Sequence, residues 1–481
     1  MMQNADLPVA VIGAGPVGLA AAAHLHERGL TPLVFERGAS AAATVAEWAH
    51  VTVFSPWEYN VDAVARALLE RSGWAMPDPD YLPTGAELIR DYLAPLAAHP
   101  AIAPNLQLGA EVLAVARRGH SKLASEGRDA APFVLLWRDS AGKRHRTFAR
   151  AVIDASGTWV RPNPIGLDGL PVEGEVEHAR RISYGIPDVL GASRDAYAGR
   201  HTLVIGAGHS AINAALDLVG LQEQAPDTRI TWATRSGGIE RVLGGGLNDQ
   251  LPGRGELGLR AVEALRLGRV EFRSPFVVER IAARGDGLMV FGTEDVRPIE
   301  LTVDRIIVAT GFRPDLSLLS ELRLSLDPVV EATPALAPLI DPNLHSCGTV
   351  RPHGVIELSH PERDFYIVGM KSYGRAPTFL MTTGYEQVRS VIAELAGDPV
   401  AAREVRLKLP ETGVCRTGAA PKGSSDCCGA PVAAPANAAV GCCGGAPKVD
   451  ASACCAADET AKAKGEAGCG CRTPERAELT A

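Results

Sequence analysis

Cysteine is almost absent from the first 410 residues of this chain of 481, which contain only Cys347. A lone cysteine in a globular region is usually an inert buried residue. Enzymes that pass electrons to disulfides usually hold a pair of cysteines beside the cofactor, and the first 410 residues contain no such pair. The other nine cysteines follow residue 410, so the last part of the sequence needs a separate explanation.

An excess of basic residues and a long apolar run are absent as well. The net charge of −8 argues against a nucleic-acid partner, which usually requires a basic face. No run of about 18 uninterrupted apolar residues occurs, so we expect no membrane span. The N-terminal segment has no basic stretch before an apolar one, so we expect no signal peptide and a cytoplasmic protein. Thiols stay reduced there, which favours free thiols or metal ligands over disulfides.

The composition is that of an ordinary soluble globular protein, with 46% apolar and 22% charged residues. A chain of 481 residues is too long for one compact core, and this length predicts two or three domains. The sequence leaves the oligomeric state open, and a homo-oligomer is one alternative.

A glycine-rich turn near the start predicts a phosphate-binding βαβ unit. Val9 to Ile12 is a short apolar run suited to a buried parallel strand. Two glycines then let the backbone turn tightly and approach a pyrophosphate, and a third lets the following helix pack on the strand. Glu36 ends the next predicted strand, where a carboxylate accepts hydrogen bonds from a ribose. The residues assigned to this site are Gly13, Gly15, Gly18, Glu36 and Arg37.

The pattern recurs near residue 206. Gly206, Gly208 and Ala211 follow a predicted strand, Thr202 to Ile205. The next strand leads to Arg235 rather than to an acid, and a planar guanidinium suits the 2′-phosphate of NADPH. The alternative is that Arg235 is only a solvated surface charge. Two dinucleotide sites predict FAD at the first and NADPH at the second, with NADPH reducing FAD.

Two further segments carry a family resemblance. AVIDASGTW (Ala151 to Trp159) and IIVATGFRPD (Ile306 to Asp315), with both glycine motifs, resemble flavoproteins that have two dinucleotide-binding domains. The chain is most similar to the flavin-containing monooxygenase group, and it also resembles the flavoproteins of bacterial arsenic-resistance operons. The resemblance implies that these segments connect the domains close to the cofactors, and it assigns Gly157 and Gly311 to cofactor binding.

The stretch from Val172 to Tyr184 resembles the monooxygenase fingerprint FxGxxxHxxx. Gly174 and His178 keep the spacing of that fingerprint, whereas Val172 stands where Phe is usual and the aromatic residue comes late, at Tyr184.

The resemblance covers about residues 7 to 400 and implies an α/β fold. Two Rossmann-like dinucleotide-binding domains are expected, the second inserted in the first. The FAD-binding domain comprises residues 1–165 and 331–408, the NADPH-binding domain comprises residues 166–330, and residues 409–481 form a disordered Cys-rich tail.

The return to the FAD-binding domain is predicted at a strand from Phe365 to Val368. Many FAD proteins of this broad group have a Gly-Asp pair after that strand, in contact with the ribityl phosphate. Here the pair is Gly369-Met370, so Gly369 is assigned to the cofactor and the aspartate contact must be absent or made differently. The segment from Pro377 onward predicts a helix. The resemblance implies that its N-terminus, near Thr378, points at the flavin.

Reduced flavin can pass electrons to a disulfide or to O2. Because no cysteine pair precedes residue 347, the transfer to O2 is the leading mechanism. NADPH reduces FAD, and the reduced flavin uses O2 to oxidise a soft nucleophile, such as sulfur, nitrogen or trivalent arsenic in a small molecule. This chemistry needs a dry pocket more than it needs protein acids and bases. The resemblance places Phe54 to Asp62 over the flavin, with Asn60 as the candidate catalytic residue. The alternative is that Asn60 only caps or turns the chain.

The region after about residue 411 is rich in Ala, Gly and Pro and has almost no aromatic residues, so we expect it to be disordered. Its flexible spacers would let paired thiolates converge on one soft ion, such as Cu(I), Zn(II) or As(III). The recurring pairs resemble those of arsenite-binding proteins. The candidate metal ligands are Cys427, Cys428, Cys442, Cys443, Cys454, Cys455, Cys469 and Cys471.

Three functional hypotheses follow. The first is an NADPH-dependent FAD oxidoreductase of the monooxygenase type, linked to metalloid or metal detoxification. The second is a soft-metal sequestration or delivery protein whose flavoprotein part is a scaffold. The third is an NADPH-dependent reductase that acts on the thiols of the tail. A low-complexity extension that is merely rich in cysteine is the alternative to a metal-binding tail.

Overall fold

The structure is a computed structural model that describes residues 6–238, 251–344, 350–377 and 379–407. All of these residues lie in one compact unit, Met1–Ala419, and a second unit, Ala420–Ala481, lies outside them. The predicted disordered tail and all ten cysteines are likewise outside the described residues.

A five-stranded parallel sheet contains the first glycine motif. Its strand order is β16-β7-β1-β2-β3, and each neighbouring pair is parallel. The strands are β16 (Phe365–Ile367), β7 (Ala151–Asp154), β1 (Val9–Ile12), β2 (Pro32–Glu36) and β3 (Leu106–Leu108). Both faces of the central strands are buried, which explains why β1 is a continuous apolar run and why the first three residues of β7 are apolar rather than alternating.

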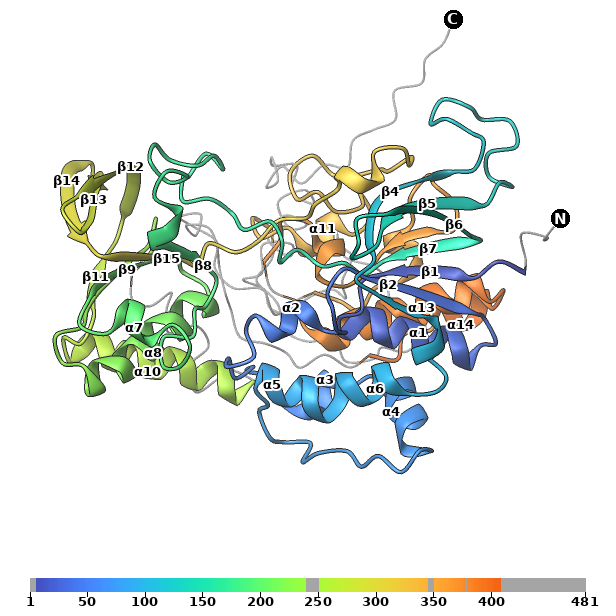
Figure 1. The fold of residues 1–481 in the computed structure, drawn as a ribbon, viewed down its shortest axis with the longest axis horizontal. Helices are drawn as coiled ribbons and strands as arrows, with labels where there is room; N and C mark the ends of the chain where they lie inside the picture. The colour runs from blue at the N-terminus through green and yellow to red at the C-terminus, as the bar shows by residue number, and fades with distance from the viewer. Residues whose placement is uncertain (1–5, 239–250, 345–349, 378, 408–481) are drawn as a thin grey trace, which may run out of the picture. The chain divides into compact units, whose positions relative to one another are not determined.

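Different structures cover the two faces of this sheet. On one face, α1 (Pro16–Glu27) and α13 (Met381–Leu395) pack against each other and join a core that includes Val9, Val11 and Ile153. On the other face, Ala10, Ile12 and Val152 belong to a core with the antiparallel sheet β4-β5-β6 (Figure 1). The three strands are β4 (Glu111–Arg117), β5 (Phe133–Arg138) and β6 (Arg144–Ala149).

A second parallel sheet repeats this arrangement, in the order β11-β10-β9-β15-β8. Its strands are β11 (Glu271–Arg273), β10 (Arg229–Ala233), β9 (His201–Ile205), β15 (Arg305–Val308) and β8 (Ile182–Tyr184). Helices α8 (His209–Gln224) and α10 (Pro252–Arg266) cover one face. The antiparallel strands β12 (Phe276–Arg284), β13 (Gly287–Glu294) and β14 (Arg297–Val303) cover the other (Figure 1).

The chain leaves the first sheet after β7, builds the second sheet, and returns to pair β16 with β7. The α/β class with parallel sheets is therefore confirmed, while the domain boundaries stay predictions. The predicted strand Val9 to Ile12 matches β1, and the predicted strand Thr202 to Ile205 matches β9 without its first residue.

The start of α13 corrects one expectation. The helix predicted from Pro377 begins at Met381, because Leu380 is extended, with φ −99° and ψ 141°. The ring of Phe379 packs edge-on against Tyr373 at 5.0 Å, so this stretch packs as an extended segment before the helix begins. Thr378, where the helix N-terminus was expected, lies outside the described residues.

The remaining α-helices are short and surround the two sheets. None of the helices in the described residues is long and apolar enough to cross a membrane. The short helices are α2 (Ala43–Ala46), α3 (Trp57–Asn60), α4 (Ala63–Glu70), α5 (Gly85–Leu88), α6 (Ala94–Ala98), α7 (Arg194–Tyr197), α11 (Ala337–Ile340), α12 (Val355–Leu358) and α14 (Pro399–Arg403).

Candidate functional site

At two positions around the turn between β1 and α1, neighbouring protein atoms leave room only for glycine. Gly13 has a φ of +98°, and a Cβ atom there would lie 2.8 Å from the carbonyl oxygen of Ala155. A Cβ atom on Gly18 would lie 2.0 Å from the carbonyl oxygen of Gly13. The first position therefore makes the turn and the third lets the helix pack on it, as the sequence predicts.

Gly15 is different, because nothing in the protein requires a glycine there. Its φ of −77° and ψ of −173° suit any residue, and no atom lies within 4 Å of a Cβ atom built on it. The open space faces the first turn of α1, whose N–H groups lack partners within the helix. A ligand that comes close to the backbone accounts for the glycine, and a pyrophosphate at a helix N-terminus is such a ligand.

Glu36 lies at the end of β2 and is buried beside this turn. Its Oε2 accepts a hydrogen bond from the Ala14 amide at 2.8 Å, and its Oε1 accepts one from the Gly38 amide at 2.8 Å. Each carboxylate oxygen keeps a lone pair, so the group can also accept hydrogen bonds from the two hydroxyls of a ribose. The predicted role of Glu36 thus fits its geometry.

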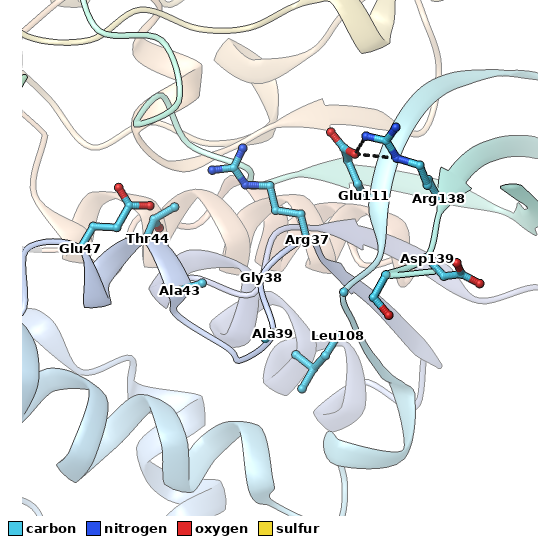
Figure 2. A pocket seen from close by; sticks show the side chains of 12 residues that line it. Arg37, Gly38, Ala39, Ala43, Thr44, Glu47, Leu108, Glu111, Arg138 and Asp139 are labelled. Atoms are coloured by element: carbon cyan, nitrogen blue, oxygen red, sulfur yellow. Dashed lines mark hydrogen bonds and ion pairs between the residues drawn. The ribbon is translucent and has the colours of Figure 1, made fainter. Parts of the chain in front are cut away.

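A cavity of about 660 Å³ opens next to Glu36, at the carboxyl ends of β2 and β3. Figure 2 shows Arg37 and Glu47 on one side of it and Leu108 on another. The ion pair between Glu111 and Arg138 forms part of its wall. Its place next to Glu36, the carboxylate predicted to bind a ribose, suits the adenosine end of FAD, and the exposed Arg37 lines it.

The second glycine turn, between β9 and α8, has the same division of roles. Gly206 has a φ of +143°, and a Cβ atom there would lie 2.3 Å from the carbonyl oxygen of Ala309. Gly208 has a φ of −94°, and no atom lies within 4 Å of its Cβ position. Ala211 is fully buried at the third position. Arg235 is exposed, two residues beyond the end of β10, at the same edge of the sheet.

The two segments predicted to connect the domains lie side by side. The Asn163 amide donates to the carbonyl oxygen of Gly311 at 2.9 Å, and the rings of Trp159 and Phe312 stack at 4.5 Å. Gly157 and Gly311 have φ values of +69° and +88°. No atom lies within 4 Å of a Cβ atom on Gly157, so this position also leaves room for a ligand.

Gly369 follows β16 with a φ of +71°, and its Cβ position lies 3.3 Å from the side chain of Val17 in the first turn of α1. The predicted cofactor residues of the first sheet therefore gather at the carboxyl ends of its strands. The usual ligand position in open α/β sheets is at this edge.

Asn60 is buried, and its side-chain amide is satisfied by its own loop. The amide nitrogen donates to the carbonyl oxygens of Ser55 at 2.7 Å and Pro56 at 3.0 Å, and the amide oxygen accepts from the Ser55 hydroxyl at 2.8 Å. These contacts are those of a residue that organises a loop. A catalytic role for Asn60 stays a prediction.

In the segment from Val172 to Tyr184, which resembles the monooxygenase fingerprint, packing within the protein explains the glycine and the tyrosine. A Cβ atom on Gly174 would lie 1.9 Å from the carbonyl oxygen of Ile281 in β12. The hydroxyl of Tyr184 donates to Glu175, and burial, with this carboxylate as neighbour, raises the pKa of Tyr184 above its ordinary range. The glycine and the tyrosine thus contribute to the packing of the second sheet.

Sequence reasoning missed a buried ionic group next to the first glycine turn. Lys371 donates to Oδ2 of Asp154 at 2.7 Å, and both side chains are at most 1% exposed. Asp154 ends β7, and Lys371 follows β16, so the pair forms only when the two strands meet. No sequence pattern marks it, because the partners are 217 residues apart.

The predicted metal ligands cannot be placed, since all eight of them follow residue 408. In the part of the chain that the structure describes, no group of three or more His, Cys, Asp or Glu residues is arranged to hold a metal ion.

A family model of pyridine nucleotide-disulphide oxidoreductases matches residues 7–360. Bacillithiol disulfide reductase from Bacillus cereus is similar in structure, with a TM-score of 0.60 and 19% identity over 83% of this chain and 99% of that one. Thioredoxin reductase from Lactococcus lactis has a TM-score of 0.50 and 16% identity over 82% and 98%. Ornithine N-hydroxylase from Kutzneria sp. 744 has a TM-score of 0.54 and 16% identity over 82% and 98%. At these identities the three likenesses show the fold alone.

The geometry at Gly15 and Gly208 generates a prediction. Gly15→Ala should weaken FAD binding about tenfold or more, because the new methyl group occupies the space of the pyrophosphate. Gly208→Ala should raise the KM for the nicotinamide cofactor by a similar factor. Fluorescence titration of the FAD-free protein and steady-state kinetics measure the two effects.

Gly220→Ala is the control, because Gly220 lies within α8 and its Cβ position makes only ordinary contacts, 3.6 Å from Leu190. Thermal unfolding of the FAD-free protein should be nearly the same for all three variants. Undiminished FAD binding by Gly15→Ala would contradict the assignment of the open space to the cofactor.

Proposed function

The chain belongs to the pyridine nucleotide-disulphide oxidoreductase family, and we propose that it is an NADPH-dependent flavin monooxygenase that oxidises a soft nucleophile. The substrate would be a small molecule with an exposed sulfur, nitrogen or trivalent arsenic atom, and O2 would be the second substrate. The family itself makes the chain an FAD-dependent oxidoreductase that uses a pyridine nucleotide. The predictions of an enzyme and of its two kinds of cofactor are therefore confirmed.

The observation that carries the proposal is the lack of cysteine before Cys347. A flavoenzyme that reduces a disulfide by thiol exchange needs thiols that reach the flavin. The strands, glycine turns and connecting segments that surround the cofactor site contain none, since all of them but β16 and α13 precede residue 347 and these two lack cysteine. FAD supplies electron transfer when bound, and O2 is an acceptor that requires no protein thiol.

The residues of this chain would bind and orient the cofactors rather than transfer protons. Gly13, Gly15 and the start of α1 would hold the FAD pyrophosphate, and Glu36 would hold its ribose. The stacked rings of Trp159 and Phe312 lie between the two connecting segments, where apolar side chains would keep water away from the reacting atoms.

The second candidate function is an NADPH-dependent reductase that acts on the thiols of the tail. The disulphide chemistry of the family and the nine cysteines after residue 410 favour it. In that case the tail would have to reach the flavin itself.

Thiol counting under anaerobic conditions separates the two functions. For a monooxygenase, one equivalent of NADPH should reduce the flavin without releasing new thiols. In air, methyl phenyl sulfide should become a sulfoxide that carries oxygen from ¹⁸O2. A variant with all nine tail cysteines changed to Ser should retain this activity. Two new thiols per NADPH, absent in that variant, would favour the reductase and sink the monooxygenase proposal.

Arg235 is proposed to select NADPH. Arg235→Ala should raise the KM for NADPH about 10- to 100-fold, because a charge-assisted hydrogen bond to the 2′-phosphate is lost, and should leave the KM for NADH unchanged. Arg229→Ala is a matched control, since Arg229 is exposed at the opposite end of the same strand, β10. An unchanged ratio of the two KM values would leave Arg235 as a solvated surface charge.

We propose that the tail binds As(III) or another soft ion and links the enzyme to metalloid or metal detoxification in the cytoplasm, where thiols stay reduced. The full chain should bind arsenite at micromolar concentration in a calorimetric titration. Changing all eight candidate ligands to Ser (Cys427, Cys428, Cys442, Cys443, Cys454, Cys455, Cys469 and Cys471) should abolish binding, whereas Cys347→Ser should not. No binding by the wild-type chain would refute a metal-binding tail.

Binding that persists without FAD, in a protein that oxidises no substrate, would instead favour a sequestration or delivery protein.

A further inference from the structure

Lys371 is buried in a polar group that joins three segments of the first sheet. Its Nζ donates to Oδ2 of Asp154 at 2.7 Å and to the Ser156 hydroxyl at 3.0 Å. The Ser156 hydroxyl in turn donates to Oδ1 of Asp154 at 2.6 Å, and the Ser156 amide donates to the same oxygen at 3.0 Å. Three hydrogen bonds thus hold the carboxylate in place.

The ammonium group is not fully engaged. A lysine ammonium carries three protons, and the described residues supply acceptors for two of them. The side chain is 1% exposed, so bulk water does not readily supply the third acceptor. A buried proton without an acceptor is costly, and its place beside the glycine turn indicates an acceptor that a bound molecule would bring.

The group lies directly at the glycine turn. Asp154 is level with Ile12, the residue before Gly13, in the register of β7 and β1. The Cα atom of Ser156 lies 3.0 Å from the Cβ position of Gly13. On the other side, Gly369 contacts Val17 in the first turn of α1. The ammonium is therefore enclosed by the segments that form the cradle for FAD.

The turn that carries Lys371 is held in place by Gln387 of α13. The Gly369 amide donates to the side-chain oxygen of Gln387 at 2.7 Å, and the side-chain nitrogen of Gln387 donates to Ser372 at 2.9 Å. That nitrogen also contacts Nε2 of His353 at 2.9 Å. Because Nδ1 of His353 faces the carbonyl oxygen of Arg351 and donates to it, Nε2 is the acceptor and the imidazole is neutral. Burial lowers the pKa of His353, which favours the same neutral form.

Stability alone does not explain a buried ion pair at this place. Replacing such a pair by neutral groups of similar volume is often neutral or even stabilising, because the pair must lose its hydration on folding. A neutral pair would therefore have served the fold about as well. The retained charge, together with the spare donor, points to a ligand.

We propose that Lys371 is a positioning residue for FAD, which donates its third proton to an oxygen atom of the cofactor between its adenosine and its isoalloxazine ring. Asp154 and Ser156 would hold the ammonium in place for that contact. Met370 stands where many FAD proteins have an aspartate, and it has no polar group for the cofactor. In this chain Lys371, the next residue, would make the polar contact instead. The inference concerns the binding of FAD and holds whichever reaction the flavin performs.

The test separates binding from folding. The double variant Lys371→Met/Asp154→Asn removes both charges together, so it leaves no unpaired buried ion, and the amide oxygen of Asn can still accept from Ser156. We expect the FAD-free double variant to unfold at nearly the temperature of the FAD-free wild type. Its dissociation constant for FAD, measured by flavin fluorescence, should rise about 10- to 100-fold.

Arg28→Met/Asp398→Asn is the matched control. This ion pair, at 3.2 Å, joins the far end of α1 to the loop after α13, and removing it should leave FAD affinity unchanged. The single variant Lys371→Met should lose FAD affinity as well, and also stability, because Asp154 is left charged and unpaired.

An unchanged FAD dissociation constant in the double variant would overturn the proposal. So would a double variant that fails to fold without FAD, since the ion pair would then be needed by the fold itself.

Discussion

The close approach of two backbone segments at the carboxyl ends of parallel strands is the constraint on which the rest of the structure depends. Gly13 lies so near the carbonyl oxygen of Ala155, and Gly206 so near that of Ala309, that only a hydrogen atom fits in place of a side chain. This approach brings β1 beside β7 and β9 beside β15 in register. It also places the start of each following helix at the same edge of its sheet, where both cofactor sites are predicted.

The sequence predicted those parts of the fold that local spacing determines. The strand Val9–Ile12 and the roles of Gly13 and Gly18 follow from a short apolar run and a tight turn, and both are properties of a few neighbouring residues. The start of α13 was wrong by four residues, because contacts of Phe379 with Tyr373 outweighed the preference of proline for a helix start. The sequence does not state which rings will pack together, even over six residues.

The glycine pattern also hides a distinction that only the structure reveals. Gly13 and Gly18 are required by neighbouring protein atoms, whereas Gly15 and Gly208 have ordinary dihedral angles and empty surroundings. In a sequence all of them look alike. No protein atom accounts for glycine at Gly15 and Gly208, which agrees with their predicted role at a ligand, whereas the glycines of the first group are explained by the fold.

Two buried ionic groups, one around Glu362 and one around Lys371, differ in their place in the first sheet. The carboxylate of Glu362 accepts from Arg117 at 2.7 Å, from Arg128 at 2.8 Å and from the Arg323 amide at 2.9 Å. Burial alone would raise the pKa of Glu362, but these hydrogen bonds outweigh it and the pKa lies below its ordinary value. That group ties β4 to the segment before β16, at the opposite edge of the sheet from the glycine turn. Among the described residues, Nε of Arg128 is buried there without a hydrogen-bond partner. The group around Lys371 differs in its place, because the proton for which the described residues supply no acceptor lies at the glycine turn. A spare buried donor alone does not distinguish the two groups, and the place of the Lys371 group at the carboxyl edge of the sheet does.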